Sequence, residues 1–131
     1  MTEEEKQKLI EKAKQFSSNA FVPYSLVPFG ACVLTEDNII FGGCNVENCD
    51  LSCSFCAVTV AVLKAVSEGY NKIKAVAVYS AGKTMPYLSG KARQIVYQFG
   101  KNAEIIVAND EKMESFNIFE MLPFAYEGEE E

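Results

Sequence analysis

Apolar residues recur three and four positions apart at the start of the chain, which is the spacing of one helix face. The pattern predicts a helix over residues 3–18, and Thr2 with Glu5 forms a capping-box pattern at its start. The apolar face of this helix consists of Leu9, Ile10, Ala13 and Phe16. The Ser-Ser-Asn string that follows residue 16 ends the helical pattern.

Shorter apolar runs bounded by turn-forming residues then predict β-strands. The strands are expected at residues 29–34, 39–44, 75–80, 103–109 and 113–116. Further helices are expected at residues 55–68, 89–100 and 118–122, the first two ending at Gly69 and Gly100. The order strand, helix, strand over residues 75–109 favours a right-handed parallel crossover.

The predicted helix over residues 55–68 is apolar on nearly every side. Its apolar members are Val58, Val60, Ala61, Val62, Leu63, Ala65 and Val66. A helix of this kind needs cover on two sides, and we expect a sheet on one side and another subunit on the other.

The composition indicates one domain, which we place at residues 1–126, followed by an acidic tail at residues 127–131 that is expected to be disordered. A net charge of −6 argues against nucleic acid as a partner. The chain lacks both a secretory start and the ~18 consecutive apolar residues of a membrane helix, so no membrane association is expected. Five cysteines, an odd number, fit reduced thiols and a cytoplasmic location. Histidine, the commonest metal ligand, does not occur.

Several uncommon strings resemble those of the small cytidine deaminases that act on free nucleosides. The resemblance covers nearly the whole chain and rests on the strings VPYS, GCNVEN, KAVSEGY and ARQ, in the family's order and at its spacings. It implies an α/β fold, a three-layer α/β/α sandwich with a mixed five-stranded sheet. It also implies a homotetramer whose active sites are completed by neighbouring subunits.

The resemblance also identifies the positions of a zinc site, because these deaminases hold zinc with three protein ligands and use a glutamate as proton shuttle. In the family, a Cys-Ala-Glu string supplies the first ligand and the glutamate, and a Pro-Cys-Gly-Ala-Cys-Arg-Gln string supplies two more cysteines. Here Cys56 keeps the first ligand position, but Val58 replaces the glutamate. Ser89 and Ala92 stand where the other two cysteines belong. A valine cannot transfer a proton and an alanine offers no donor atom, so we expect no metal cofactor and no intact catalytic residue.

The cysteines near this position allow other interpretations as well. Cys53 and Cys56 form a C-x-x-C pair with Cys49 close before it, a weak candidate for a metal site because no second pair follows. Alternatively, Cys56 is a reactive thiol at a helix N-terminus, with Lys91 and Arg93 nearby. The simplest interpretation is that these cysteines are small buried side chains.

The family's nucleoside-binding positions are better preserved in this sequence than its zinc-site positions. Asn45 and Glu47 match residues that hydrogen-bond the ribose, although both would equally satisfy backbone groups of a tight loop. The family usually has Phe-Pro-Val where this chain has Val27, Pro28 and Phe29. In an extended segment positions 27 and 29 face the same way, so Phe29 is expected to stack on the base in place of the family's phenylalanine. Tyr126 matches a phenylalanine that reaches toward a neighbour's site, and an ordinary interface aromatic explains it as well.

Three functions follow from these observations. The first prediction is a deaminase relative that has lost catalysis, a pseudoenzyme that binds nucleosides or regulates an active paralogue. The second is an active cytidine or deoxycytidine deaminase with a rearranged site. The third is a purely structural oligomer.

Overall fold

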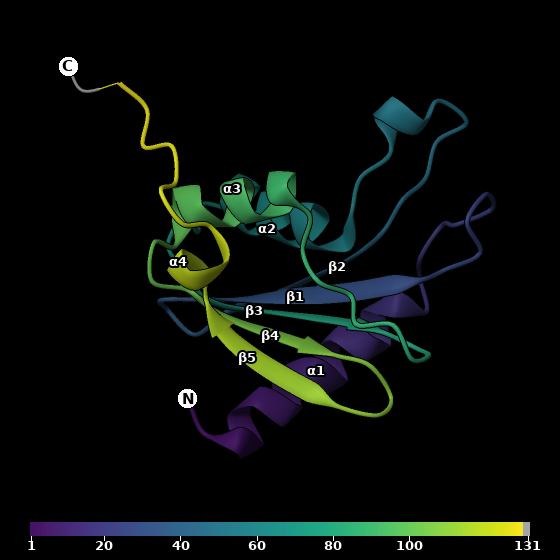
Figure 1. Ribbon diagram of the computed structural model, residues 1–131, viewed down its shortest axis with the longest axis horizontal. Coiled ribbons are helices and arrows are strands. Elements are labelled where there is room, and N and C mark those ends of the chain that lie inside the picture. Colours follow the sequence, from purple (N-terminus) through teal and green to yellow (C-terminus); the bar gives the residue numbers. More distant parts are fainter. Residues whose placement is uncertain (130–131) are drawn as a thin grey trace.

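The computed structural model describes residues 1–129, and over this range it contains a five-stranded sheet between helices (Figure 1). The strands are β1 (Phe29–Thr35), β2 (Ile40–Cys44), β3 (Ile73–Ser80), β4 (Glu104–Ala108) and β5 (Met113–Asn117). The helices are α1 (Glu3–Ser17), α2 (Ala57–Ser67), α3 (Gly90–Phe99) and α4 (Ile118–Met121), with a 3-10 turn, η1, at Leu51–Cys53.

The sheet is mixed, with the strand order β2-β1-β3-β4-β5. Only β3 and β4 run parallel among these strands, joined by α3, and the other neighbours are antiparallel. This confirms the predicted α/β fold with a mixed five-stranded sheet, and the predicted parallel crossover.

Two apolar layers hold the helices to the sheet. Strand residues alternate between the two faces, so in β1 Ala31 and Val33 pack toward α2 and α3, whereas Cys32 packs toward α1. Figure 1 shows α1 below the sheet and α2 and α3 above it, the three-layer arrangement expected from the resemblance. The capping box formed by Thr2 and Glu5 begins α1, as predicted.

The structure covers α2 more completely than its sequence suggested. Val62 and Ala65 are fully buried within the chain, whereas Leu63 is 47% exposed. The argument that α2 must be covered by another subunit is therefore wrong for most of the helix, because α3 also packs against it.

The C-terminal segment is partly fixed to the domain. Glu127 forms an ion pair with Lys101, with 2.8 Å between Nζ and Oε2, so the first residue of the expected acidic tail contacts the domain. The last two residues of that tail, 130–131, lie outside the described residues. Within residues 1–129, none of the helices combines the length and apolar character needed to cross a membrane.

Candidate functional site

A pocket of about 200 Å³ lies where the N-termini of α2 and α3 meet. Its lining residues are Phe29, Cys56, Ala57, Val58, Val78, Pro86, Tyr87, Leu88, Ser89 and Ala92. All four positions assigned to the family's catalytic site are among them. The structure thus brings together residues that are up to 36 positions apart in the sequence.

Local helix-capping geometry places the two polar members of this set. Cys56 is the N-cap residue of α2, and its Sγ forms a hydrogen bond with Thr59 Oγ1 at 3.1 Å. Ser89 is the N-cap residue of α3, and its Oγ accepts a hydrogen bond from the Ala92 amide at 3.2 Å. Val58 and Ala92 are buried, 3% and 1% exposed, and present only carbon atoms.

These residues do not fit a zinc ion. A catalytic zinc takes three protein ligands of the Cys, His, Asp or Glu type, and the pocket supplies one thiol. Cys49 and Cys53 are exposed on the loop before α2, and no group of three such side chains within residues 1–129 lies close enough to hold a metal. The weak candidate site at Cys53 and Cys56 therefore gains no support.

The reactive-thiol interpretation retains part of its basis. Cys56 is exposed and shares a hollow of about 190 Å³ with Lys91. Arg93 is engaged elsewhere, because its Nε and Nη1 each donate at 2.9 Å, to the carbonyls of Leu88 and Met121. Cys32 is a contrasting case, since burial raises the pKa of its thiol to about 12. Of these two thiols, only Cys56 is exposed and lines a pocket.

The two predicted ribose contacts already hold the neighbouring loop. Asn45 is 8% exposed, accepts at 2.9 Å from the Phe29 amide and donates at 3.0 Å to the Val27 carbonyl. Glu47 Oε1 accepts from the amides of Tyr24 and Ser25 at 3.1 and 3.0 Å. Hydrogen bonds from the Ser25 side chain and these amides lower the pKa of Glu47. Both side chains therefore have a demonstrable structural role.

The predicted aromatic residues occupy different places. Phe29 lines the pocket, and its stacking on a base stays a prediction. Tyr126 is 69% exposed on the C-terminal segment, where its carbonyl accepts a hydrogen bond from Gln94 Nε2 at 3.1 Å. Among the described residues, Tyr126 does not line this pocket.

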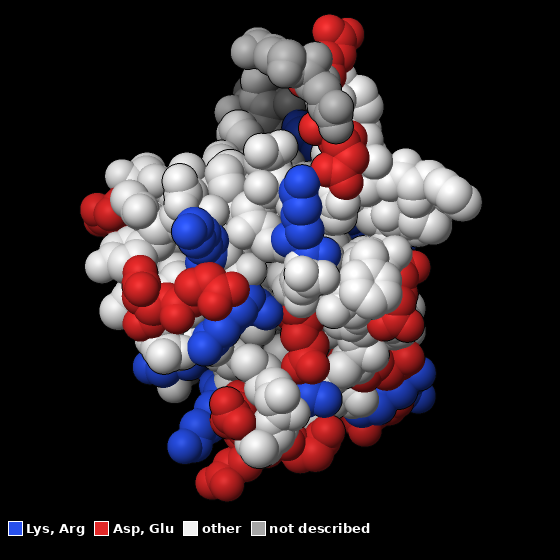
Figure 2. Space-filling view, turned by 90° about the vertical axis from the view of Figure 1, so that its left-hand side faces the viewer, with Lys and Arg blue, Asp and Glu red and all other residues white. Residues whose placement is uncertain are grey.

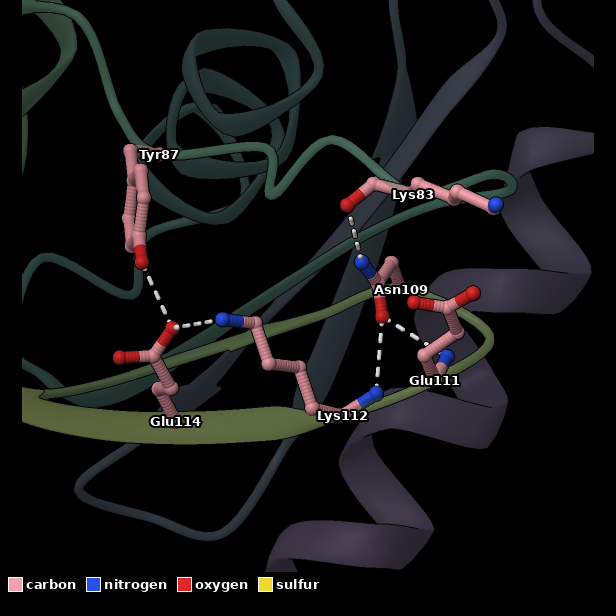
Figure 3. A network of polar contacts seen from close by, with 6 residues as sticks. All are labelled: Lys83, Tyr87, Asn109, Glu111, Lys112 and Glu114. Atoms are coloured by element: carbon pink, nitrogen blue, oxygen red, sulfur yellow. Dashed lines mark hydrogen bonds and ion pairs between the residues drawn. The ribbon is translucent and has the colours of Figure 1, made fainter.

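Sequence reasoning missed Tyr87, which stands two residues before Ser89. Its ring lines the pocket and its hydroxyl donates to Glu114 Oε1 at 2.6 Å (Figure 3). This hydrogen bond raises the pKa of Tyr87. The position of Tyr87 just before the N-cap of α3 was an available signal, but nothing in the sequence linked it to Glu114.

At the C-terminal end of α3, away from the pocket, the charge distribution is mixed. Figure 2 views the molecule from this end and shows lysine and acidic side chains side by side. A hollow of about 460 Å³ illustrates this, since Glu36 lies among Lys72, Lys74 and Lys101 in its lining. The face shown carries no continuous basic surface of the kind that binds nucleic acid.

Comparisons with known proteins agree on one family. The sequence pattern described as "Cytidine and deoxycytidylate deaminase zinc-binding region" matches residues 3–107. A cytidine deaminase of Sporosarcina psychrophila is 35% identical over 126 residues, which are 95% of this chain and 93% of that protein. One of Halalkalibacterium halodurans is 30% identical over 96% of this chain and 97% of that protein.

Solved structures give the same result. The crystal structure of cytidine deaminase from Burkholderia pseudomallei superposes with a TM-score of 0.88 at 32% identity, over 96% of this chain and 100% of that chain. That of Mycobacterium tuberculosis gives a TM-score of 0.80 at 28% identity, over 92% and 95%.

These similarities contradict the prediction that catalysis has been lost. Relatives that share about a third of their residues with this chain over nearly its full length are named cytidine deaminases. The second interpretation, an active deaminase with a rearranged site, agrees better with them.

Proposed function

Because the chain belongs to the cytidine and deoxycytidylate deaminase family, we propose that it converts cytidine or deoxycytidine to the corresponding uridine by hydrolysis. The observation that carries this proposal is the convergence of Cys56, Ser89 and Ala92 on one pocket. That pocket lies in a fold that superposes on crystalline cytidine deaminases.

The lining of the pocket suits a pyrimidine base. Phe29, Val58 and Val78 offer apolar surface to the ring, and binding sites of this kind combine apolar walls with a few polar groups. Hydrolysis at C4 adds water and releases ammonia, so a proton must leave the water and another must reach the amino group. Since the donor set does not fit zinc, the proposal assigns these transfers to polar groups of the pocket, such as the Cys56 thiol.

The direct test is conversion of cytidine to uridine by protein purified from a host without its own cytidine deaminase. We expect turnover above the uncatalysed rate, together with ammonia release. A Cys56→Phe variant is the control, because its ring would fill the pocket and abolish turnover. A folded natural chain that leaves cytidine unchanged would contradict the proposal.

We further propose that Asn45, Glu47 and Phe29 contact the nucleoside, Phe29 through the base and the other two through the sugar. Glu47→Ala is expected to weaken cytidine binding about tenfold through loss of a charged hydrogen bond. Free cytosine, which has no sugar, should lose no affinity. Calorimetric titration of both ligands checks this, with the neighbouring Asn48→Ala as the control. Equal losses for cytidine and cytosine would indicate that Glu47 only supports the loop.

The protein is also proposed to be a homotetramer, with Tyr126 near a neighbouring subunit. Large apolar side chains exposed on the single chain support an interface, because a surface of this kind is seldom left in contact with water. They include Phe21, Leu26, Leu51, Phe55 and Leu63. The five free cysteines fit a reducing compartment, and we place the protein in the cytoplasm.

Leu63→Asp is expected to split the tetramer into smaller folded species, because Leu63 is 47% exposed and a charge there is costly only inside an interface. Light scattering combined with circular dichroism measures both properties. Val62→Asp, at a fully buried position, should instead prevent folding. A monomeric natural protein at micromolar concentration would contradict the proposal.

A further inference from the structure

The segment between β3 and α3, residues 81–89, forms one wall of the pocket. It contributes Pro86, Tyr87, Leu88 and Ser89 to the lining. We call these nine residues the pocket strap. Polar side chains from β5 and from the β4–β5 turn hold the strap at two points (Figure 3).

The first point is a buried asparagine at the end of β4. Asn109 is 7% exposed, and its Nδ2 donates to the Lys83 carbonyl of the strap at 2.9 Å. Its Oδ1 accepts from the amides of Glu111 and Lys112, both at 2.8 Å. Asn109 therefore ties the strap to the β4–β5 turn without contacting the pocket.

The second point is the hydroxyl of Tyr87. Figure 3 shows its ring extending from the strap to β5, where the hydroxyl donates to Glu114 Oε1 at 2.6 Å. Lys112 Nζ lies 3.6 Å from the same oxygen and keeps the carboxylate in place. The ring also packs edge-on against Phe116, with 6.1 Å between the ring centroids. These contacts fix both torsions of the Tyr87 side chain.

We propose that Tyr87 determines which bases fit the pocket and that Glu114 is the positioning residue that fixes it. This inference rests on the proposed nucleoside function, since it takes a pyrimidine base as the occupant. A ring held at its hydroxyl is less free to turn aside, so it limits the bulk of a base on this side. Without the hydrogen bond the ring can swing outward, and the pocket then admits a larger substituent.

The test compares the dissociation constants of cytidine and of a cytidine that carries a phenyl group at C5. In the natural chain we expect the bulky ligand to bind more weakly. Tyr87→Phe and Glu114→Ala should each reduce the preference for cytidine over the bulky ligand about fivefold, the equivalent of one hydrogen bond. Because both changes remove the same contact, the double variant should narrow it no further.

A matched control exists on the other face of the sheet. Tyr79 donates its hydroxyl to Asp110, the same type of pair, but it packs toward α1, away from the pocket. Tyr79→Phe should leave the preference unchanged, although it alters a buried contact. A change of equal size in this variant would indicate a general loosening of the fold and would overturn the inference.

Amide hydrogen exchange at Met85 and at residues 87–89 provides a measurement that needs no ligand. Glu114→Ala should speed exchange there at least threefold, and Tyr79→Phe should not. If the natural chain binds no nucleoside, the proposed function fails, whereas the positioning role of Glu114 is still decided by exchange. Unchanged exchange, or an unchanged ligand preference in both Tyr87→Phe and Glu114→Ala, overturns the inference.

Discussion

Gly30→Ala is expected to destabilise the protein by about 3 kcal/mol or to prevent folding, at the upper end of the usual cost of overpacking. Gly30 lies in β1 on the face of the sheet that packs against α1. A Cβ atom at this position would lie 1.8 Å from the Ala13 carbonyl oxygen and 2.6 Å from the Ser17 amide nitrogen. Both are backbone atoms of a helix and cannot turn aside, so α1 must move away from the sheet. Urea unfolding followed by circular dichroism measures the loss.

Two other glycines provide controls for this prediction. At Gly42 the added Cβ would lie 1.8 Å from a carbon of the Phe16 ring, which is a side chain and can change rotamer. Gly42→Ala should therefore cost less than Gly30→Ala. At Gly90, the first residue of α3, no atom lies within 4 Å of the added Cβ, so Gly90→Ala should be neutral or slightly stabilising. Equal losses at Gly30 and Gly42 would contradict the explanation from backbone contact.

The sequence predicts the elements of this fold better than the contacts between them. The apolar pattern placed β1 to within one residue at its end, because alternation in a strand depends on neighbours along the chain. The start of α2 was placed two residues early, since the Cys56 side chain caps no backbone amide of the helix and gives no capping signal. The cover of α2 by α3 depends on contacts between distant segments, and no local pattern reports it.

The sequence likewise predicted only part of the candidate site. Motif spacing identified Cys56 and Ser89, and the structure brings them to one pocket. Tyr87 and Glu114 were missed because they meet across the edge of the sheet, 27 residues apart. The prediction of lost catalysis gave all the weight to four positions, whereas the similarity to named deaminases extends over nearly the whole chain.

Ser89→Cys with Ala92→Cys is expected to create a zinc site beside Cys56. All three positions line the same hollow at the N-termini of α2 and α3. Three thiolates with a fourth position open are a sufficient set for a catalytic zinc, so the double variant should bind about one zinc ion per chain. Loss of the Ser89 cap costs about 1 kcal/mol, and zinc binding to the folded state should more than offset it. Elemental analysis and the zinc-dependent rise in melting temperature measure the result.

The same experiment separates metal binding from proton transfer. Val58→Glu alone should bind no zinc, because it adds only one carboxylate to one thiol. The triple variant, Val58→Glu with Ser89→Cys and Ala92→Cys, supplies the three thiol ligands and a glutamate as proton shuttle. Deamination by that triple variant should be abolished by a chelator. Deamination by the natural chain should persist in the chelator, because its own donor set does not fit zinc. A natural protein that carries about one zinc ion per chain, or a single Val58→Glu variant that acquires one, would show that the ligands lie elsewhere.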